Sequence, residues 1–244
     1  NSSYWDVHKS GYSPKLIGFL LKRAGFSDVR VEIQEGCHLA ARAVKRVHKG
    51  ERQVGPTLEN IRVDHRARYE FATQFVPQAG RVLDVACGVG YGAKILSDAS
   101  AAAQIVAIDI DAVAVAYARE HYQTSKVRFE VGDALSAVWP EAEFDLAVAF
   151  ETIEHLPDAS SFLSRLHQAI RPGGILICST PNQDQLPCSA TVFPFHVRHY
   201  TPQQMEALLA DAGFMLLERH TQPDARSAEI HPGWGGQYNI AVCR

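Results

Sequence analysis

The sequence predicts an α/β fold built on a doubly wound, seven-stranded and mostly parallel sheet. From Arg81 onward, short apolar runs alternate with amphipathic helical patterns, which is typical of a parallel sheet with helices on both faces. The last two apolar runs follow each other without a helical pattern between them. They predict an antiparallel pair of strands at one edge of the sheet.

The individual elements follow from the spacing of apolar residues along the chain. Short apolar runs predict five parallel strands at residues 82–85, 105–108, 127–131, 144–150 and 175–179. Helical spacing predicts the intervening helices at about residues 92–97, 112–121, 159–170 and 202–212. The antiparallel edge pair is expected at residues 214–220 and 238–242.

A separate appendage is predicted before this sheet. Helical spacing over residues 14–25 is followed by an alternating apolar pattern at 29–33, which indicates a helix and then a short hairpin. We therefore expect residues 1–45 to form a helix-hairpin appendage.

A linker is expected between the appendage and the main domain. Residues 46–56 are polar and rich in turn formers, so they read as a connecting segment. Thr57 is then expected to cap a helix that runs to about Val76. The main domain is predicted to span residues 57–244.

The appendage resembles the C-terminal end of the same chain. With His8 aligned to His196, an offset of 188 residues, eight of the nineteen positions from 8 to 26 are identical. One interpretation is that two amphipathic helices merely look alike. The interpretation we favour is that residues 1–45 copy the last helix and hairpin of a second domain of the same kind. The chain begins at Asn1, which fits a piece of a longer polypeptide fused to further domains.

The composition is that of an ordinary globular protein. The chain has 244 residues, 46% of them hydrophobic and 21% charged, which is enough to bury a substantial core. A net charge of -3, without Lys and Arg interleaved with aromatics, argues against a nucleic-acid partner. Five scattered cysteines without a C-x-x-C pair favour a reducing compartment. Without an apolar run of ~18–20 residues or a signal pattern, we expect no membrane span and a cytoplasmic location.

A glycine-rich turn follows the first predicted strand. The strand at 82–85 runs directly into the sequence CGVGYG at 87–92, and a helical pattern comes next. Glycines at such a turn let the backbone approach a ligand closely. However, Gly88, Gly90 and Ala93 also satisfy the G-x-G-x-x-G/A dinucleotide fingerprint, so a NAD-dependent oxidoreductase is an alternative at this point.

Acidic residues at two strand ends indicate which ligand the turn takes. Asp84, beside the turn, suits a ligand that carries a positive charge and would repel a pyrophosphate. Asp109 ends the second strand, where a carboxylate can accept both hydroxyls of a ribose in either class of cofactor. The turn is therefore predicted to bind a cationic nucleoside ligand.

Six segments, in this order and spacing, resemble the motifs of class I S-adenosylmethionine (SAM)-dependent methyltransferases. They are residues 82–92, Asp109, Gly132-Asp133-Ala134, Phe144-Asp145, Glu154-His155-Leu156 and Arg171-Pro172-Gly173-Gly174. The resemblance covers about residues 57–244. It implies strand order 3-2-1-4-5-7-6 with the last strand antiparallel, and an enzyme that takes its methyl group from SAM.

The resemblance also implies roles for individual residues. Gly88 and Gly90 are expected to line the methionine part of SAM, and Asp109 is expected to hold the ribose. Asp133 and Ala134 are expected to flank the adenine, although Asp133 could instead be a turn former after a strand.

Further cofactor contacts are expected around the sulfonium. Phe150 is expected beside it, and Tyr69 either lies over the cofactor or packs in the core. The complete predicted cofactor set is Tyr69, Asp84, Ala86, Gly88, Gly90, Tyr91, Asp109, Ile110, Asp133, Ala134 and Phe150.

The candidate catalytic residues lie after the fourth strand and in the long segment before the last helix. His155 is either a general base or a residue that shapes the site, and Glu151 is expected to orient it. The segment 182–200 has the length of a lid or binding loop. Its His196 and Arg198 either hold a phosphate or sugar, or cap the helix that follows. No spacing indicates a metal site.

These patterns predict a SAM-dependent O-methyltransferase acting on a small or carbohydrate acceptor. The segment 193–200 resembles the acceptor side of methyltransferases associated with bacterial cell-surface glycan (O-antigen type) synthesis, which implies a role in polysaccharide biosynthesis. One alternative is a methyltransferase of the quinone-pathway kind, which shares the Glu-His-Leu context. Alternatives of another class are the NAD-dependent oxidoreductase and a non-catalytic SAM-binding module.

Overall fold

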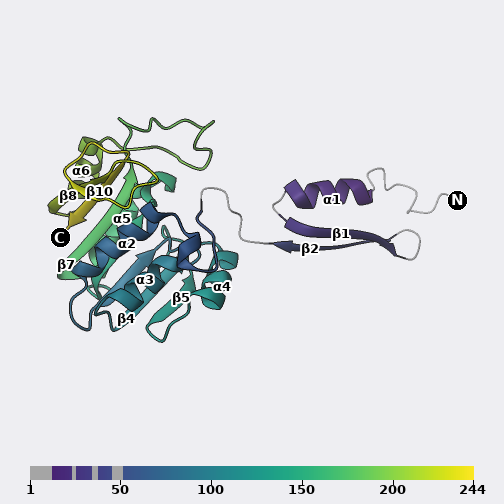
Figure 1. Ribbon diagram of the computed structural model, residues 1–244, viewed down its shortest axis with the longest axis horizontal. Coiled ribbons are helices and arrows are strands. Elements are labelled where there is room, and N and C mark those ends of the chain that lie inside the picture. Colours follow the sequence, from purple (N-terminus) through teal and green to yellow (C-terminus); the bar gives the residue numbers. More distant parts are fainter. Residues whose placement is uncertain (1–12, 24–25, 35–37, 46–51) are drawn as a thin grey trace. The chain divides into compact units, whose positions relative to one another are not determined.

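The computed structural model describes residues 13–23, 26–34, 38–45 and 52–244, which form two separate units (Figure 1). The chain divides into residues 1–50 and 51–244. The first unit contains a two-stranded sheet and the second an eight-stranded sheet. Each unit therefore has its own backbone hydrogen-bond network.

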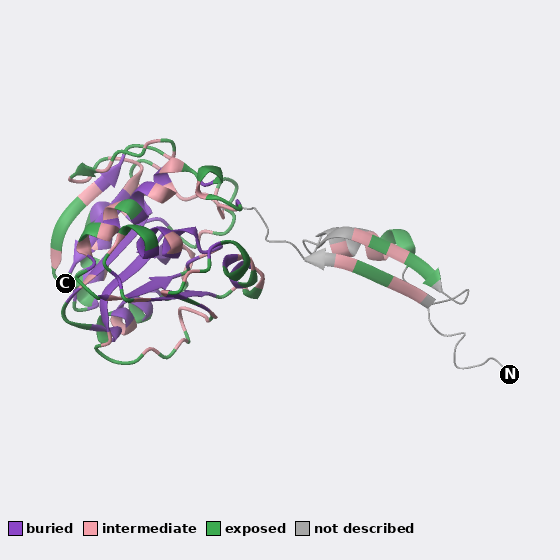
Figure 2. Ribbon diagram, turned by 60° about the horizontal axis from the view of Figure 1, so that its bottom comes forward, coloured by how far each residue is buried: buried purple, intermediate pink, exposed green. Residues whose placement is uncertain are grey.

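The first unit contains the predicted helix and hairpin. Helix α1 (Pro14–Arg23) is followed by strands β1 (Phe26–Gln34) and β2 (His38–Lys45), which pair antiparallel. The hydroxyl of Ser13 accepts a hydrogen bond from the backbone N–H of Leu16 at 3.1 Å, which caps the helix. None of the described side chains of this unit is fully buried, as the pink and green ribbon of Figure 2 shows.

The second unit is built on a mixed sheet with the order β5-β4-β3-β6-β7-β10-β8-β9. The strands are β3 (Arg81–Val85), β4 (Gln104–Asp109), β5 (Val127–Val131), β6 (Phe144–Phe150), β7 (Ile170–Pro181), β8 (Leu216–Gln222), β9 (His231–Pro232) and β10 (Tyr238–Cys243). Strands β3 to β7 pair in parallel, whereas β10 is antiparallel to both β7 and β8. Apart from β9, this is the expected order 3-2-1-4-5-7-6.

Helices cover both faces of this sheet. They are α2 (Val63–Ala72), α3 (Tyr91–Ala99), α4 (Ala112–His121), α5 (Ala159–Ala169) and α6 (Pro202–Asp211). Helices α5 and α6 share one apolar core with alternate residues of β3, among them Leu83 and Val85. Asp84 points to the opposite face because side chains alternate along a strand, and it contacts Tyr69 of α2 there. No helix of the described residues is long and apolar enough to cross a membrane.

The predicted helix from Thr57 to Val76 was wrong in its first half. The segment forms η2 (Leu58–Asn60), then α2, then η3 (Thr73–Phe75). Thr57 makes no side-chain cap to the backbone, and its hydroxyl bonds the side chain of Asn60 instead. The interruption lies at Ile61, whose extended backbone places its side chain in the core at 3% exposure. Burial of this one apolar side chain outweighs the helical propensity around it.

Two further elements differ from the prediction. Strand β7 begins at Ile170, so residues 171–174 extend the strand rather than precede it. The change of register in its pairing with β6, between Phe144 and Leu146, accommodates these residues. The short strand β9 was not predicted, because its two residues are too few to form a periodic pattern.

Candidate active site

The turn between β3 and α3 has the backbone geometry of a ligand-binding turn. Ala86, Gly88 and Gly90 have positive φ angles of 58°, 58° and 90°. The backbone N–H of Cys87 donates to the carbonyl of Ile108 at 2.9 Å, which ties the turn to the end of β4. A left-handed backbone at Ala86 is strained for a residue with a Cβ, and such strain is often found at functional turns.

Glycine is required for different reasons at the two positions of the turn. A Cβ at Gly88 would have only the side chain of Arg52 near it, at 3.9 Å, so this side of the turn has room for a ligand. A Cβ at Gly90 would lie 2.7 Å from Ala118 and Phe129, so Gly90 permits close packing of the turn on the protein. Of the two predicted glycines, Gly88 is the better placed to face a cofactor.

Asp84 is a fully buried carboxyl group beside this turn. Its Oδ1 accepts a hydrogen bond from the hydroxyl of Tyr69 at 3.0 Å. Its Oδ2 has no hydrogen-bond partner among the described residues. Burial raises the pKa of Asp84 to about 8, although the bond from Tyr69 opposes this and the nearby charge of Asp109 adds to it.

The unpartnered oxygen of Asp84 fits the ammonium group of SAM. A buried acceptor without a donor is costly, and a cationic donor would satisfy it. The open side of Gly88 adds a place where backbone can approach the ligand. These two observations on the turn agree with the predicted cofactor.

Both carboxylate oxygens of Asp109, the predicted ribose ligand, already accept hydrogen bonds from protein groups. Its Oδ2 accepts from the backbone N–H of Gly88 at 2.8 Å, and its Oδ1 accepts from that of Asp111 at 2.9 Å. Arg52 also donates to Oδ1 of Asp109 at 3.2 Å and to Oδ2 of Asp111 at 2.8 Å. Arg52 was not among the predicted site residues, because nothing in the local pattern of the linker indicates where its side chain points.

Three aromatic rings lie between the turn and the end of β6. Tyr69 makes edge-to-face contacts with Tyr91, at 5.6 Å between ring centroids, and with Phe150, at 4.9 Å. A Cβ at Gly92 would lie 2.0 Å from the ring of Tyr69, so only glycine fits there. Tyr69 packs in the core and donates to Asp84, whereas its position over the cofactor stays a prediction.

Three predicted cofactor residues, two of them expected to flank the adenine, lie just after β4 and β5. Ile110 is 66% exposed, which is unusual for an isoleucine and leaves its side chain available to a ligand. The side chain of Asp133 accepts a hydrogen bond from the backbone N–H of Leu135 at 2.9 Å. It therefore forms a turn after the strand, which was the alternative prediction for this residue. Ala134 packs half-buried against the core.

Glu151 starts the corner that follows β6. Its φ is +48°, and its carboxylate accepts the hydroxyl of Ser179 at 2.7 Å. The guanidinium of buried Arg68 approaches the same carboxylate at 3.7 Å. These contacts tie Glu151 to Ser179 and Arg68. The ring of His155 is held instead by the carbonyl of Phe195, so these contacts do not support the expected role of Glu151 in orienting it.

His155 ends the short helix η4 (Ile153–His155) at the same corner. Its Nδ1 lies 3.1 Å from the carbonyl of Phe195. The long segment 182–200 is attached here by a second bond, from the backbone N–H of Val197 to the carbonyl of Glu154 at 2.7 Å. Tertiary contacts thus bring the two predicted catalytic regions together.

His196 lies beside His155 across this junction, with 4.5 Å between ring centroids. Its Nδ1 is 2.6 Å from Nε2 of the buried His199. Burial, and then the charges of His155 and His199, lower the pKa of His196 to about 4, so it is neutral at physiological pH. The alternative role as a helix cap was wrong, because Thr201 and Gln204 form the capping box of α6.

Two residues of this corner, Glu154 and His199, were missing from the predicted site. Glu154 is fully buried, and its pKa is raised well above its usual value by burial and then by Glu151. The signal available in the sequence was its place one turn after Glu151 and beside His155. His199 could not be found locally, because its role depends on the fold of the loop.

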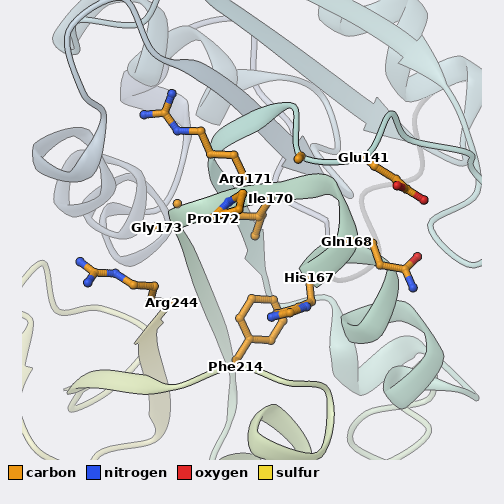
Figure 3. Close-up of a pocket in the computed structure, with 11 residues that line it drawn as sticks. Glu141, His167, Gln168, Ile170, Arg171, Pro172, Gly173, Phe214 and Arg244 are labelled. Carbon is orange, nitrogen blue, oxygen red and sulfur yellow. The ribbon is translucent and has the colours of Figure 1, made fainter.

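A separate cavity of about 560 Å³ lies at the other end of β7 (Figure 3). Its lining includes Ile170, Pro172 and Gly173 at the start of the strand, together with Phe214 and Arg244. None of the predicted site residues lines it. In an open parallel sheet the ligand crevice lies at the carboxyl ends of the strands, which is where the turn and the His155 corner are.

Part of the second unit is similar to proteins of known family. Residues 83–178 match the family model described as a methyltransferase domain. A "Probable S-adenosylmethionine-dependent methyltransferase" of Mycolicibacterium smegmatis is 37% identical over 139 residues, 56% of this chain and 52% of that protein. A ubiquinone biosynthesis O-methyltransferase of a Ruegeria species is 29% identical over 161 residues, 59% of this chain and 64% of that protein. The chain spans about half the length of the mycobacterial relatives that it matches.

Solved structures show the same fold. A SAM-dependent methyltransferase of Mesorhizobium loti superimposes with a TM-score of 0.60 at 17% identity, over 75% of this chain and 99% of that one. The cyclase SpnF also reaches a TM-score of 0.60, at 21% identity, over 72% and 79%. At these identities the likenesses concern the fold alone. Residues 83–178 are therefore similar to a methyltransferase domain, and the second unit has the fold seen in SAM-dependent methyltransferases.

Proposed function

We propose that this domain transfers the methyl group of SAM to a hydroxyl oxygen of a small acceptor molecule. The observation that carries the proposal is the pairing of β3 with β6 in parallel. This pairing brings the turn beside Asp84 and the corner from Glu151 to His155 to the same edge of the sheet. A site for a cation and a corner with titratable side chains are what an O-methyl transfer needs side by side.

The turn residues would hold the cofactor. Asp84 faces the ammonium, the backbone of Ala86 and Gly88 approaches the methionine part, and Asp109 takes the ribose. The adenine would lie between Ile110 and the residues Asp133 and Ala134. Tyr69, Tyr91 and Phe150 would line the sulfonium end and exclude water from it.

His155 would accept the proton of the acceptor hydroxyl. The carbonyl of Phe195 can only accept a hydrogen bond, so Nδ1 of His155 carries the proton and Nε2 carries the lone pair. As the acceptor oxygen attacks the methyl carbon, its proton passes to Nε2 and the bond from sulfur to carbon breaks. The products are the methyl ether and S-adenosylhomocysteine.

Two acceptor classes are supported by different observations. The likeness of residues 193–200 to glycan-associated methyltransferases supports a carbohydrate acceptor in polysaccharide biosynthesis. Exposed apolar side chains on the same loop, among them Val192, Phe195 and Val197, support an apolar phenolic acceptor. Relatives whose names are ubiquinone and tocopherol O-methyltransferases favour the second class.

Calorimetry followed by turnover tests the proposal. We expect the chain to bind SAM and S-adenosylhomocysteine but not NAD. Labelled methyl transfer to nucleotide sugars would support the carbohydrate class, and transfer to catechols the phenolic class. Binding of NAD without binding of SAM would overturn the proposal. Tight SAM binding without transfer to any hydroxyl acceptor would leave only the non-catalytic module.

We also propose that residues 1–45 are the C-terminal end of a preceding domain of the same fold, joined by the linker 46–56 to the domain 57–244. Helices α1 and α6 begin and end at positions separated by the same 188 residues. Their caps correspond too, since Ser13 and Thr201 each accept the backbone N–H three residues on. Sequencing the gene upstream tests this, and the absence of a sheet-forming sequence there would refute it.

A further inference from the structure

Three possible metal ligands converge where η4 meets the long loop. Glu154, His155 and His196 each offer one ligand atom, and these atoms all lie within 4.8 Å of one another. Glu154 is buried and the two histidines are half-buried, so the group faces a partly enclosed space. A single proton acceptor does not require three such groups.

The hydrogen bonds around the histidines place both lone pairs on Nε2. In His155, the bond from Nδ1 to the carbonyl of Phe195 fixes the tautomer. The tautomer of His196 follows from its neighbour His199. Nδ1 of His199 donates to the carbonyl of Leu186, so Nε2 of His199 must be an acceptor. Nδ1 of His196 therefore donates to Nε2 of His199. Metal-binding histidines are commonly oriented in this way by a bond from the other ring nitrogen.

Glu154 supplies a second, independent indication. Its Oε2 accepts the hydroxyl of Thr180 at 3.2 Å, but its Oε1 has no hydrogen-bond partner among the described residues. The carboxyl group is 0% exposed. An unpartnered carboxylate oxygen inside the protein costs free energy unless a cation or proton meets it. A divalent cation would satisfy it and would also offset the nearby charge of Glu151.

We propose that Glu154, His155 and His196 bind a divalent transition-metal cation, for which zinc is the reference ion. Two imidazoles and one carboxylate suit zinc and its neighbours, whereas magnesium prefers oxygen ligands and near-complete hydration. Ligands bound at ~2.1 Å in a tetrahedral site lie about 3.4 Å apart, so the side chains close slightly around the ion. The remaining position would be open to the acceptor.

The ion would change how the acceptor is activated, and this part rests on the proposed O-methyl transfer. A hydroxyl bound to the ion loses its proton to solvent at a lower pH, and the oxygen then attacks the methyl carbon. With the ion bound, Nε2 of His155 is a ligand, and solvent takes the part proposed above for this ring as proton acceptor. The metal is neither oxidised nor reduced, so the bonds formed and broken are the same as in the substitution without the metal.

Metal titration of the full chain tests the site without any acceptor. After dialysis against a chelator, we expect one Zn²⁺ per chain to bind with micromolar or tighter affinity by calorimetry. Co²⁺ should develop the visible absorption of a histidine-bound ion. Glu154→Gln and His196→Gln should each weaken Zn²⁺ binding by at least tenfold. His199→Gln, which removes the bond that fixes the tautomer, should weaken it less.

His167→Gln is the matched control, because His167 lies at the separate cavity of Figure 3. SAM binding and circular dichroism of each variant report whether it is folded. If Glu154→Gln does not fold, His196→Gln alone decides. Zn²⁺ affinity equal in His196→Gln and His167→Gln would overturn the metal site. Failure of the unaltered chain to bind SAM would instead refute the proposed function. The failure of the metal site and the failure of the proposed function are therefore distinguishable.

Discussion

The two halves of the candidate active site are built in different ways. On the cofactor half, the groups belong to the ends of β3 and β4 and to the turns that follow directly, such as Asp84, Gly88 and Asp109. On the acceptor half, Glu154 and His155 come from one corner, whereas His196 comes from a loop far along the chain. A bond from Val197 to Glu154 joins them. Local turns define the first half, and long-range contacts define the second.

The difference predicts how the halves respond to change. A substitution on the cofactor half should alter affinity for SAM, because the proposed contacts with the cofactor lie there. A substitution on the acceptor half should alter turnover and leave SAM affinity unchanged. A variant that changed SAM affinity and turnover equally would contradict this division of the site.

The largest effect is expected on the acceptor half, from His155→Ala. Loss of a positioned proton acceptor typically lowers kcat by about 10²–10⁴-fold, and loss of a metal ligand would act in the same direction. The affinity for SAM should stay within about twofold of the original. Single-turnover kinetics and calorimetry measure the two quantities. Full activity in His155→Ala would remove this residue from the chemistry.

Asp84→Asn should have the next largest effect, on the cofactor half. A charge-assisted bond contributes roughly 1.5–3 kcal/mol, so SAM affinity should fall roughly 10- to 100-fold. Folding at neutral pH should change little, because a pKa of about 8 keeps the buried carboxyl protonated there. Asn resembles that neutral form. Calorimetry and urea unfolding of the variant measure both quantities.

The same carboxyl group predicts a pH dependence with a definite sign. In the free protein the folded state holds a proton that the unfolded chain has lost, so this group contributes less stability as pH rises from about 4 to about 8. An ammonium favours the ionised form, so SAM binding should release a proton at pH ~7 and strengthen toward pH ~8. Calorimetry in two buffers of different ionisation enthalpy counts the proton. Equal proton release by Asp84→Asn would contradict this assignment.

Arg52→Ala should have a smaller effect of opposite sign. Arg52 occupies Oδ1 of Asp109, which the ribose would need, and its side chain is 29% exposed. An ion pair of this exposure contributes up to about 1 kcal/mol, so its removal should tighten SAM binding up to about fivefold. Arg219→Ala breaks a comparable pair with Glu206 on another part of the domain and serves as the control. Weaker SAM binding in Arg52→Ala would show that the guanidinium contacts the cofactor.

Within the candidate site, the smallest effect is expected from Ala86→Gly. Relief of a positive φ should stabilise the fold by about 1 kcal/mol, as measured by urea unfolding. Ala79→Gly is the matched control, because Ala79 is also exposed and has a φ of 55°. Both variants should gain stability, but only Ala86→Gly should weaken SAM binding. Identical SAM binding in both would show that the strain at Ala86 has no role in the turn.

A second contrast, between the two helix-hairpin segments, shows what packing adds to a pattern. Met205 of α6 is fully buried, whereas Ile17, its counterpart in α1, is only half-buried. Met205→Ala should therefore cost the main domain ~2–5 kcal/mol. Ile17→Ala should leave its unfolding unchanged. The same spacing of apolar residues forms a helix in both places, but only α6 packs on a large sheet.

Much of the fold could be predicted from the sequence because its signals are local. The alternation of apolar runs and helices placed β3 to β7 within a few residues. The errors lay where tertiary packing overrides local preference, as at Ile61 and at the start of β7. Asp84, Gly88 and Asp109 could be proposed as cofactor residues for the same reason, since each adjoins a recognisable turn.

By itself, the sequence determined the class of fold, the glycine turn and the identity of the carboxylates at the strand ends. These depend on spacings of a few residues, within which backbone geometry is set by steric preference and side-chain size. Only the tertiary structure decided that Arg52 lies on Asp109 and that His199 sets the tautomer of His196. Those arrangements depend on contacts between segments far apart in the chain, and no short-range pattern encodes them.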